Sequence, residues 1–332
     1  MNETIHHRAA LSLGTNLEPR AARLRSARTR LAELPGTRIV AVSGEYETEP
    51  VDVPPEFAAL KFLNQAVLVE TEMPVEDFSA AMHAIEDELG RVRTVRNGPR
   101  TIDLDLIFFD GLFRDDPAIT LPHPRAWRRD FVIAPLREIG VDVVAEAKRC
   151  IRGGMRARRR AVAEPTRKAA SAKICADLAR RFATDFANGR PPTIAAYLAT
   201  PDEIDLTEFL NSFIDRGGIA AVPTWNGATY ELRRLASLAK DALRRGPMKV
   251  YEPINTELIA AEKIDCWLVP GLAFTIGGLR LGYGGGWYDR LLAAARTDAA
   301  KFGIAYEFQI LADLPEAATD IRLGAIFSSD IH

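Results

Sequence analysis

Hydrophobic and polar positions in the first part of the chain change between the periods of strands and of helices. Four runs rich in apolar and β-branched residues predict strands at 9–13, 39–48, 63–71 and 101–109. Two stretches with apolar residues at helical spacing, each closed by glycine or proline, predict helices at 20–34 and 75–89. The order β-α-β-β-α-β is that of a ferredoxin-like α+β sandwich, an antiparallel sheet with helices on one side.

The second part of the chain shows short, buried-looking strands that alternate with helical segments. Strands are predicted at 193–198, 219–222, 266–269, 302–305 and 325–327. Helices are predicted at 206–216, near 255–262 and from about Trp287, after a basic helical stretch at 148–190. This alternation is typical of a largely parallel, three-layer α/β domain, in which ligands bind at the carboxyl ends of the strands.

Length and composition agree with two domains. The chain has 332 residues, about twice the usual size of one domain, with 47% hydrophobic and 27% charged residues. Its net charge of −2 is too small to attract the protein electrostatically to nucleic acid or membranes. The stretch 148–190 is strongly basic but has few aromatic residues and repeats apolar residues at helical spacing. We therefore expect neither a nucleic acid nor a membrane as a partner.

The cysteines and the apolar runs indicate the cytoplasm. Cys150, Cys175 and Cys266 are far apart, so they form no Cys-x-x-Cys metal motif and no disulfide framework, and buried reduced thiols are expected. The N-terminus lacks the basic and then long apolar pattern of a signal peptide. The longest uncharged run, 266–279, is interrupted by proline and glycine and is too short to span a bilayer.

The stretch 98–110 carries the first candidate chemistry. Within the predicted strand, Asp103 and Asp105 are two residues apart, so both carboxylates lie on one face. Two like charges at this spacing disfavour joint ionisation, and a divalent metal removes that penalty. Mg²⁺ commonly uses one or two carboxylates together with phosphate oxygens, which suggests a nucleotide-phosphate site. An edge strand whose polar face meets water is the alternative.

The segment 90–100 before this strand is rich in arginine. Arg91, Arg93, Arg96 and Arg100 could close over a polyphosphate, because guanidinium forks match phosphate oxygens. A solvated arginine-rich loop is the alternative.

Residues 9 to about 140 resemble the 6-hydroxymethyl-7,8-dihydropterin pyrophosphokinases, which transfer a diphosphate from ATP to a pterin alcohol and release AMP. Six motifs in the family's order carry the resemblance: Leu13-Gly-Thr-Asn-Leu17, Tyr46-Glu-Thr-Glu-Pro50, Phe62-Leu-Asn64, Gly90-Arg-Val-Arg93, Gly98-Pro-Arg-Thr-Ile-Asp-Leu-Asp105 and Leu121-Pro-His123. The resemblance implies that Asp103 and Asp105 bind two Mg²⁺ ions and that Arg91 and Arg100 clamp the ATP phosphates. We predict these four residues as catalytic.

The same resemblance implies binding residues around them. It places Arg93, His123 and Arg129 near the nucleotide. It implies that Asn64 binds the pterin edge and that Phe62 and Phe131 stack on its two faces, and it adds two further substrate-binding residues, Thr48 and Val51. From the residues alone, a turn histidine, a turn asparagine and core phenylalanines would be the simpler interpretation.

A glycine-rich loop carries the second candidate chemistry. It follows the predicted strand 266–269 and reads Arg280-Leu-Gly-Tyr-Gly-Gly-Gly-Trp-Tyr-Asp-Arg290. Glycines let backbone N–H groups approach an anion without a Cβ in the way, and a following helix start favours negative charge. The pattern predicts a phosphate-binding loop, with a flexible connector as the alternative.

The stretch from Lys148 to about Ser329 resembles 5-formyltetrahydrofolate cyclo-ligases, also called methenyltetrahydrofolate synthetases. The motifs are Lys148-Arg-Cys-Ile-Arg152, Asp202-Glu-Ile-Asp205, Val269-Pro-Gly-Leu-Ala-Phe274, the glycine-rich loop itself and Phe308-Gln309. The resemblance implies that the folate pterin binds Glu203, that Arg280 is catalytic and that Asp289 is a Mg²⁺ ligand. It also implies an ATP site made by Lys148, Arg152, Arg280, Gly282, Tyr283, Gly284, Gly285, Gly286, Tyr288 and Asp289.

Together these patterns predict a bifunctional folate enzyme with domains at 1–143 and 144–332, both using ATP and Mg²⁺ on small-molecule substrates. An alternative is that only the cyclo-ligase half is active, because the first half has a short C-terminal tail and substitutions in its motifs. The first half would then be a pterin- or nucleotide-binding module. The oligomeric state stays open.

Overall fold

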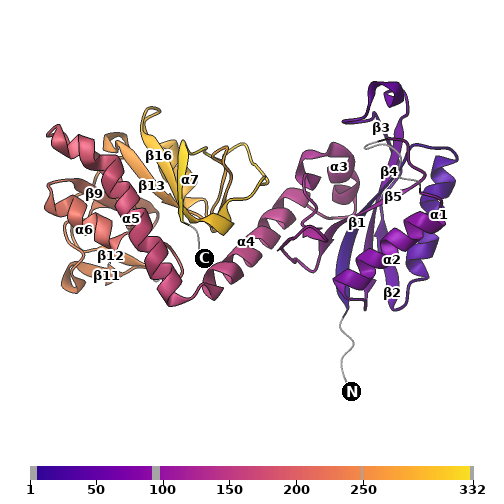
Figure 1. Cartoon of the computed structure of the whole chain (residues 1–332), viewed down its shortest axis with the longest axis horizontal. Coiled ribbons are helices and arrows are strands. Elements are labelled where there is room, and N and C mark those ends of the chain that lie inside the picture. The colour runs from indigo at the N-terminus through magenta and orange to yellow at the C-terminus, as the bar shows by residue number, and fades with distance from the viewer. Residues whose placement is uncertain (1–5, 92–97, 248–249, 330–332) are drawn as a thin grey trace, which may run out of the picture. The chain divides into compact units, whose positions relative to one another are not determined.

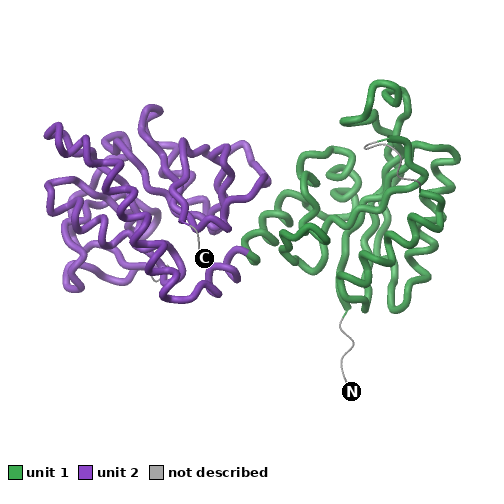
Figure 2. Tube along the Cα trace, in the orientation of Figure 1, with its two compact units in different colours: residues 1–154 green, residues 155–332 purple. Residues whose placement is uncertain are grey.

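The computed structural model describes residues 6–91, 98–247 and 250–329. The chain divides into two compact units, unit 1 at 1–154 and unit 2 at 155–332 (Figure 2). The division falls within helix α4 (Val143–Ala161), so that its first turns belong to unit 1 and its last turns to unit 2.

Unit 1 is built on a five-stranded antiparallel sheet (Figure 1). The strands pair in the order β2 (Thr37–Val42), β4 (Phe62–Thr71), β1 (His7–Thr15) and β5 (Asp103–Phe109), and β3 (Tyr46–Thr48) also pairs with β4. The prediction of one strand at 39–48 was wrong, because Ser43 interrupts it. Its hydroxyl accepts a hydrogen bond from Ala66 N (2.9 Å), while the next N–H, that of Gly44, turns to the Glu138 carboxylate.

Helices cover both faces of this sheet, whereas the sequence predicted them on one side only (Figure 1). On one face, α1 (Arg20–Ala32) and α2 (Val75–Glu88) bury residues at helical spacing, such as Leu24, Ala27 and Leu31, against apolar strand residues. The other face packs against α3 (Asp130–Glu138), a helix that the sequence reading missed, and the start of α4. Shorter elements complete the unit: η1 (Pro55–Phe57), β6 (Arg114–Asp115), β7 (Thr120–Leu121) and η2 (Ala126–Arg128).

Unit 2 contains a six-stranded mixed sheet. Its strands lie in the order β10 (Tyr230–Arg234), β9 (Ile219–Trp225), β8 (Thr193–Ala195), β13 (Cys266–Pro270), β16 (Ala300–Tyr306) and β17 (Ala325–Ser329). Neighbours from β9 to β17 are parallel, and β10 is antiparallel to β9. Small paired strands lie outside it: β11 (Leu243–Arg245), β12 (Tyr251–Pro253), β14 (Ala273–Phe274) and β15 (Arg280–Leu281).

Two helices cover one face of this sheet and one helix packs on the other. α5 (Glu164–Ala187) and α6 (Thr207–Asp215) contribute to the larger core cluster, whereas α7 (Trp287–Ala293) buries Leu292 in the opposite one. The basic stretch forms two helices instead of one, because Pro165 fits only the first turn of a new helix. No helix in the described part of the chain combines the length and hydrophobicity needed to cross a membrane.

The helix predicted near 255–262 is absent, and this prediction was wrong. The segment instead pairs with β10, since Arg234 N donates to Glu257 O (2.8 Å) and Ile259 N donates to Leu232 O (2.9 Å). Only a short 3₁₀ turn, η4 (Ala261–Lys263), follows. Two other short 3₁₀ turns are η3 (Lys240–Ala242) and η5 (Glu307–Gln309).

Candidate active sites

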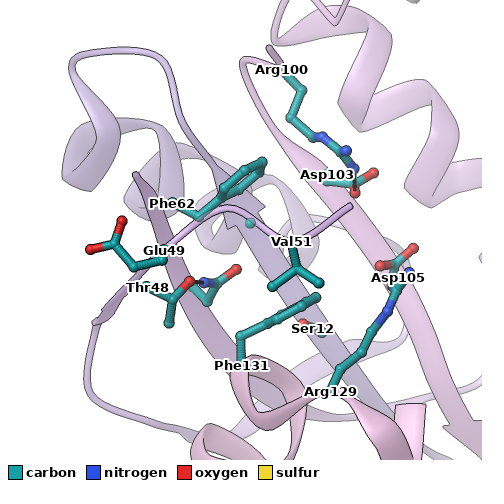
Figure 3. Close-up of a pocket in the computed structure, with 12 residues that line it drawn as sticks. Ser12, Thr48, Glu49, Val51, Phe62, Arg100, Asp103, Asp105, Arg129 and Phe131 are labelled. Atoms are coloured by element: carbon teal, nitrogen blue, oxygen red, sulfur yellow. Dashed lines mark hydrogen bonds and ion pairs between the residues drawn. The ribbon is translucent and has the colours of Figure 1, made fainter. Parts of the chain in front are cut away.

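One face of the unit 1 sheet forms the floor of a pocket (Figure 3). Strand register places Asn64, Gly14 and Asp103 side by side on β4, β1 and β5, with Ser12 beside Asp105. A Cβ at Gly14 would lie 3.1 Å from the Asn64 side-chain oxygen, so glycine leaves room on this floor.

The pocket gathers residues that the sequence predicted from distant motifs. Those that line it are Thr48, Val51, Phe62, Asn64, Arg100, Asp103, Asp105, Arg129 and Phe131. Three further lining residues, missed as site residues, are Ser12, Gly14 and Glu49. Alternation along β1 was the available signal for Ser12 and Gly14, because both share one face of a strand whose other face is apolar.

Polar and aromatic groups line this pocket together. Asn64 is 3% exposed, and its amide nitrogen donates to the Thr48 hydroxyl at 2.8 Å. The guanidinium carbon of Arg100 lies 5.5 Å from the centre of the Phe62 ring, and that of Arg129 lies 5.5 Å from the Phe131 ring. The two rings come from β4 and α3 and lie on opposite sides of Val51 in the view of Figure 3.

Asp103 lies between two arginines predicted to clamp phosphate. Arg91 Nη2 is 2.6 Å from its carboxylate, and Arg100 forms an ion pair with it (Figure 3). Arg91 also pairs with Glu86, a carboxylate that is 1% exposed and accepts a hydrogen bond from Leu104 N at 2.7 Å. Burial raises the pKa of Glu86, against the opposing effects of this backbone hydrogen bond and of Arg91. Glu86 thus connects α2, Arg91 and the acidic strand.

Asp105 lies in a different environment. Its carboxylate is 3.7 Å from His123 Nε2, and Figure 3 shows the Arg129 side chain directed toward it. Burial raises the pKa of Asp105, and the charge of Asp103 raises it further. Burial also lowers the pKa of His123, although Asp105 opposes this. Like-charge repulsion within the acidic pair is therefore only partly compensated by protein groups.

Backbone contacts fix one end of the arginine-rich segment. Arg100 N donates to the Asn16 side-chain oxygen at 2.7 Å, and Asn16 N donates to Arg100 O at 3.3 Å. Asn16 thereby ties Arg100 to the end of β1, a role that the sequence analysis missed. The predicted residues Arg93 and Arg96 fall in 92–97, outside the described ranges.

In unit 2, the predicted folate residue Glu203 is in contact with the glycine-rich loop. Its Oε1 accepts a hydrogen bond from the Tyr283 hydroxyl at 2.6 Å, and its Oε2 accepts one from Thr200 N at 2.8 Å. Glu203 follows β8 in the chain and also lines a large cavity of about 800 Å³ beside α5. The structure therefore brings together two motifs that are 80 residues apart.

The glycines of the loop differ in conformation. Gly284 and Gly286 have φ values of 107° and 65°, which disfavour side chains with a Cβ. Gly285 does not have a positive φ, but a Cβ there would lie 2.6 Å from the Trp287 ring. A Cβ at Gly282 would lie 2.7 Å from Arg280 Nη1. The local structure thus requires glycine for two different reasons, backbone conformation and close approach.

Arg280 and Asp289 flank this loop and contact each other. Arg280 Nη2 is 2.5 Å from Asp289 Oδ1, and the Arg280 side chain is 3% exposed. The guanidinium carbon lies 5.7 Å from the centre of the Tyr288 ring. Burial raises the pKa of Tyr288 above its usual range, and the charge of Glu203 adds to this effect. Arg280, Tyr288 and Asp289 therefore form one cluster, and their role in binding ATP stays a prediction.

Two residues predicted for this ATP site lie in unit 1. Lys148 and Arg152 are on the turns of α4 that belong to unit 1, so their role at the second site stays a prediction.

The sequence analysis missed Arg159, a buried arginine on the last turns of α4 that contacts Tyr283. It also missed the β9–β10 hairpin, which packs Trp225 and Tyr230 against Trp287.

Two sequence profiles match the chain. The profile described as 7,8-dihydro-6-hydroxymethylpterin-pyrophosphokinase matches residues 10–141, and that of the 5-formyltetrahydrofolate cyclo-ligase family matches residues 144–329. A Methylorubrum extorquens 2-amino-4-hydroxy-6-hydroxymethyldihydropteridine pyrophosphokinase is 41% identical over 138 residues, which is 41% of this chain and 85% of the relative. The Bacillus subtilis enzyme of the same name is 39% identical over 139 residues, 42% of this chain and 81% of the relative.

Among solved structures, 5,10-methenyltetrahydrofolate synthetase of Aquifex aeolicus is similar to part of the chain. The sequence identity is 30% and the TM-score is 0.48, with 55% of this chain and 89% of that chain covered.

Proposed function

The chain belongs to the 6-hydroxymethylpterin pyrophosphokinase family in its first part and to the 5-formyltetrahydrofolate cyclo-ligase family in its second, and from this we propose a bifunctional folate enzyme. ATP is a substrate of both reactions. The observation that carries the first assignment is the pocket of unit 1, which gathers nine predicted site residues from strands, loops and helix α3.

The proposed reaction of unit 1 moves a diphosphate from ATP to the hydroxymethyl group of 6-hydroxymethyl-7,8-dihydropterin and releases AMP. Arg100 lines the pocket, and Arg91 pairs with the lining residue Asp103. Both arginines would neutralise charge on the transferred group, which is the main requirement of phosphoryl transfer. Asn64 lies on the floor and offers an amide to the pterin edge. Phe62 and Phe131 offer two aromatic faces for stacking.

The residues of this pocket also fit Mg²⁺. Asp103 and Asp105 supply two carboxylates on one strand face. Burial, and next the charge of Asp103, raise the pKa of Asp105, and a bound cation would offset both effects. Mg²⁺ commonly binds one or two carboxylates and takes its remaining ligands from water and phosphate, so two carboxylates are sufficient. Bound Mg²⁺ would neutralise charge on the ATP phosphates. The protein's own part is to hold two oxygen donors on a rigid strand.

The proposed reaction of unit 2 closes 5-formyltetrahydrofolate to 5,10-methenyltetrahydrofolate. The formyl oxygen attacks the γ-phosphorus of ATP and ADP leaves. N10 then attacks the activated carbon and loses its proton, and phosphate leaves with ring closure. The contact between Glu203 and the glycine-rich loop supports this assignment, since it places the predicted pterin ligand beside the predicted phosphate loop. Arg280 and Asp289 flank the loop and form an ion pair with each other, and Asp289 is the proposed Mg²⁺ ligand.

We also propose finer assignments. The order of strands and helices in unit 1 supports a ferredoxin-like core with an added second helical layer, and the parallel neighbours in unit 2 support a three-layer α/β domain. The functional domains are proposed at 1–143 and 144–332, with the boundary between the two matched profiles. The free, buried cysteines agree with a proposed cytoplasmic location.

The test is to measure both reactions with the full-length chain. One assay follows AMP formed from ATP and the pterin alcohol, and the other follows the near-ultraviolet absorbance of the methenyl product. We expect both activities. Methenyl formation without AMP formation would favour the alternative in which unit 1 only binds pterin or nucleotide.

A further inference from the structure

Arg159 occupies a position where the helix pattern calls for an apolar side chain. On the same helix, Ile151 and Met155 are 1% and 0% exposed, and Arg159 follows one turn later with 1% exposure. Residues four apart lie on one helix face, so Arg159 continues a buried stripe. The other arginines of this turn are more exposed: Arg158 is half-buried and Arg160 is exposed. A fully buried arginine requires partners, because an unpaired buried charge is strongly unfavourable.

The partners of Arg159 come from three separate segments of unit 2. Arg159 Nη1 donates to the Tyr283 hydroxyl at 2.6 Å, and Nη2 is 2.8 Å from Asp202 Oδ2. Nη1 also lies 3.4 Å from Gly271 O, in the loop after β13. The guanidinium therefore joins the glycine-rich loop, the loop after β8 and the loop after β13.

Tyr283 links Arg159 to Glu203 by hydrogen bonds. Its hydroxyl accepts the hydrogen bond from Arg159 and donates one to Glu203 Oε1, while Arg159 Nη1 itself is 3.9 Å from the same carboxylate. The guanidinium carbon also lies 5.5 Å from the centre of the Tyr283 ring. Tyr283 is thus held by its hydroxyl and by its ring. Together these contacts form the Arg159–Tyr283–Glu203 chain.

Stability alone does not account for an arginine at this position. A buried ion pair is often no more stable than well-packed apolar residues of similar volume. Arg159 Nε and Nη2 are also buried without a hydrogen bond in the described structure, and Nη2 has only its ion pair with Asp202, which adds to the cost. Unlike an apolar residue, the arginine can connect the loops by hydrogen bonds and ion pairs, because its planar guanidinium donates to several acceptors.

We propose that Arg159 is a positioning residue of the cyclo-ligase site, which fixes the Glu203 carboxylate and the glycine-rich loop relative to each other through the Tyr283 hydroxyl. The inference rests on the proposed function of unit 2. Arg159 is 1% exposed, so it acts through these two residues and not on the substrates. Correct placement of Glu203 and of the loop is needed to bind the folate and ATP, respectively.

The test compares steady-state kinetics of the wild-type full-length chain with Arg159→Met, Arg159→Lys and Tyr283→Phe. We expect Arg159→Met to raise the KM for both 5-formyltetrahydrofolate and ATP by at least about ten-fold, the loss typical of one hydrogen bond to a charged group. The kcat at saturation should stay within about three-fold of wild type, since binding and not turnover is affected. Arg159→Lys, which keeps the charge but not the fork, should give intermediate values.

Tyr283→Phe covers the case in which the Arg159 variants do not fold. Its side chain is partly exposed, and the change removes only the hydroxyl that joins Arg159 to Glu203. We expect it to raise the folate KM. In the double variant with Arg159→Met, the effects should be less than additive, because both changes break one chain of contacts. Arg160→Met, on the exposed side of the same helix, is the matched control for charge and should leave both KM values unchanged.

The outcomes separate three explanations. A purely structural role would lower the fraction of active enzyme, and hence kcat, with unchanged KM values, and this result would overturn the proposal. Unchanged KM values in Tyr283→Phe, or fully additive effects, would also overturn it. If the wild-type chain forms no methenyl product, the assigned reaction itself fails. AMP formation by unit 1 of the same variants serves as an internal check of protein quality.

Discussion

Replacing Asp103 by Asn tests whether the acidic strand carries the pyrophosphokinase chemistry. The change keeps the size of the side chain but removes the charge between Arg91 and Arg100. The three side chains are 15%, 15% and 22% exposed, between the environments of surface and buried ion pairs. Surface pairs contribute up to about 1 kcal/mol, and breaking a buried pair costs about 3–5 kcal/mol. We therefore expect the free energy of unfolding of unit 1 to fall by about 1–3 kcal/mol.

The effect on activity should be larger. The variant loses a proposed Mg²⁺ ligand and the anchor of two proposed phosphate-binding arginines, so AMP formation should fall at least about 100-fold, as for the loss of one transition-state contact. The cyclo-ligase activity of the same chain should stay unchanged, because no described contact of Asp103 involves unit 2. The two assays are AMP release and methenyl absorbance, measured below the melting temperature of the variant.

A matched control distinguishes chemistry from lost charge. Glu70→Gln removes a carboxylate that pairs with Arg38 at 2.5 Å on the same sheet, away from the pocket. It should leave AMP formation near wild type. AMP formation within about three-fold of wild type in Asp103→Asn would refute the metal and charge assignment. An equal loss in both variants would point to a general effect of charge on unit 1.

Three further predictions follow from local structure. Gly284→Ala strains a backbone with φ of 107° and should raise the KM for ATP in the cyclo-ligase assay. The control Gly217→Ala strains a similar backbone, with φ of 87° after α6, and should lower stability but leave that KM unchanged. Burial raises the pKa of Cys150 and Cys266 to about 12, so iodoacetamide should label neither in the native protein at about pH 8 but both after denaturation; native labelling of either would contradict their burial. Asn64→Leu should raise the KM for the pterin by at least about ten-fold, and an unchanged KM would remove Asn64 from the pterin site.

The site residues of unit 1 could be predicted from the sequence because they are on strands and in short motifs. Period-two alternation predicted that Asp103 and Asp105 share a face, and both line the same pocket. The neighbours of these acids could not be derived in this way. The register of three strands places Gly14 between Asn64 and Asp103. This register depends on how the strands pack against the helices on both faces of the sheet.

Secondary structure was predicted least well where tertiary contacts override local preference. The segment near 255–262 has helix-forming residues, yet hydrogen bonds to β10 hold it extended. Helix α3 was missed because the stretch between the acidic strand and the basic helices contains Pro135 within an apolar run. Its apolar residues form a helix that covers the second face of the sheet.

The sequence by itself determined the two families, the order of most strands and helices, and the residue types that each reaction needs, because motifs and periodicity are local properties of the chain. Only the tertiary structure decided which polar groups contact one another. Arg159 shows the difference: in the sequence it is one of 13 basic residues in the stretch 148–190. Folding buries it and leaves Arg160 exposed, because helix packing places one face of α4 toward the loops that carry Tyr283 and Asp202. Burial then gives one charge a specific set of partners, which local sequence cannot specify.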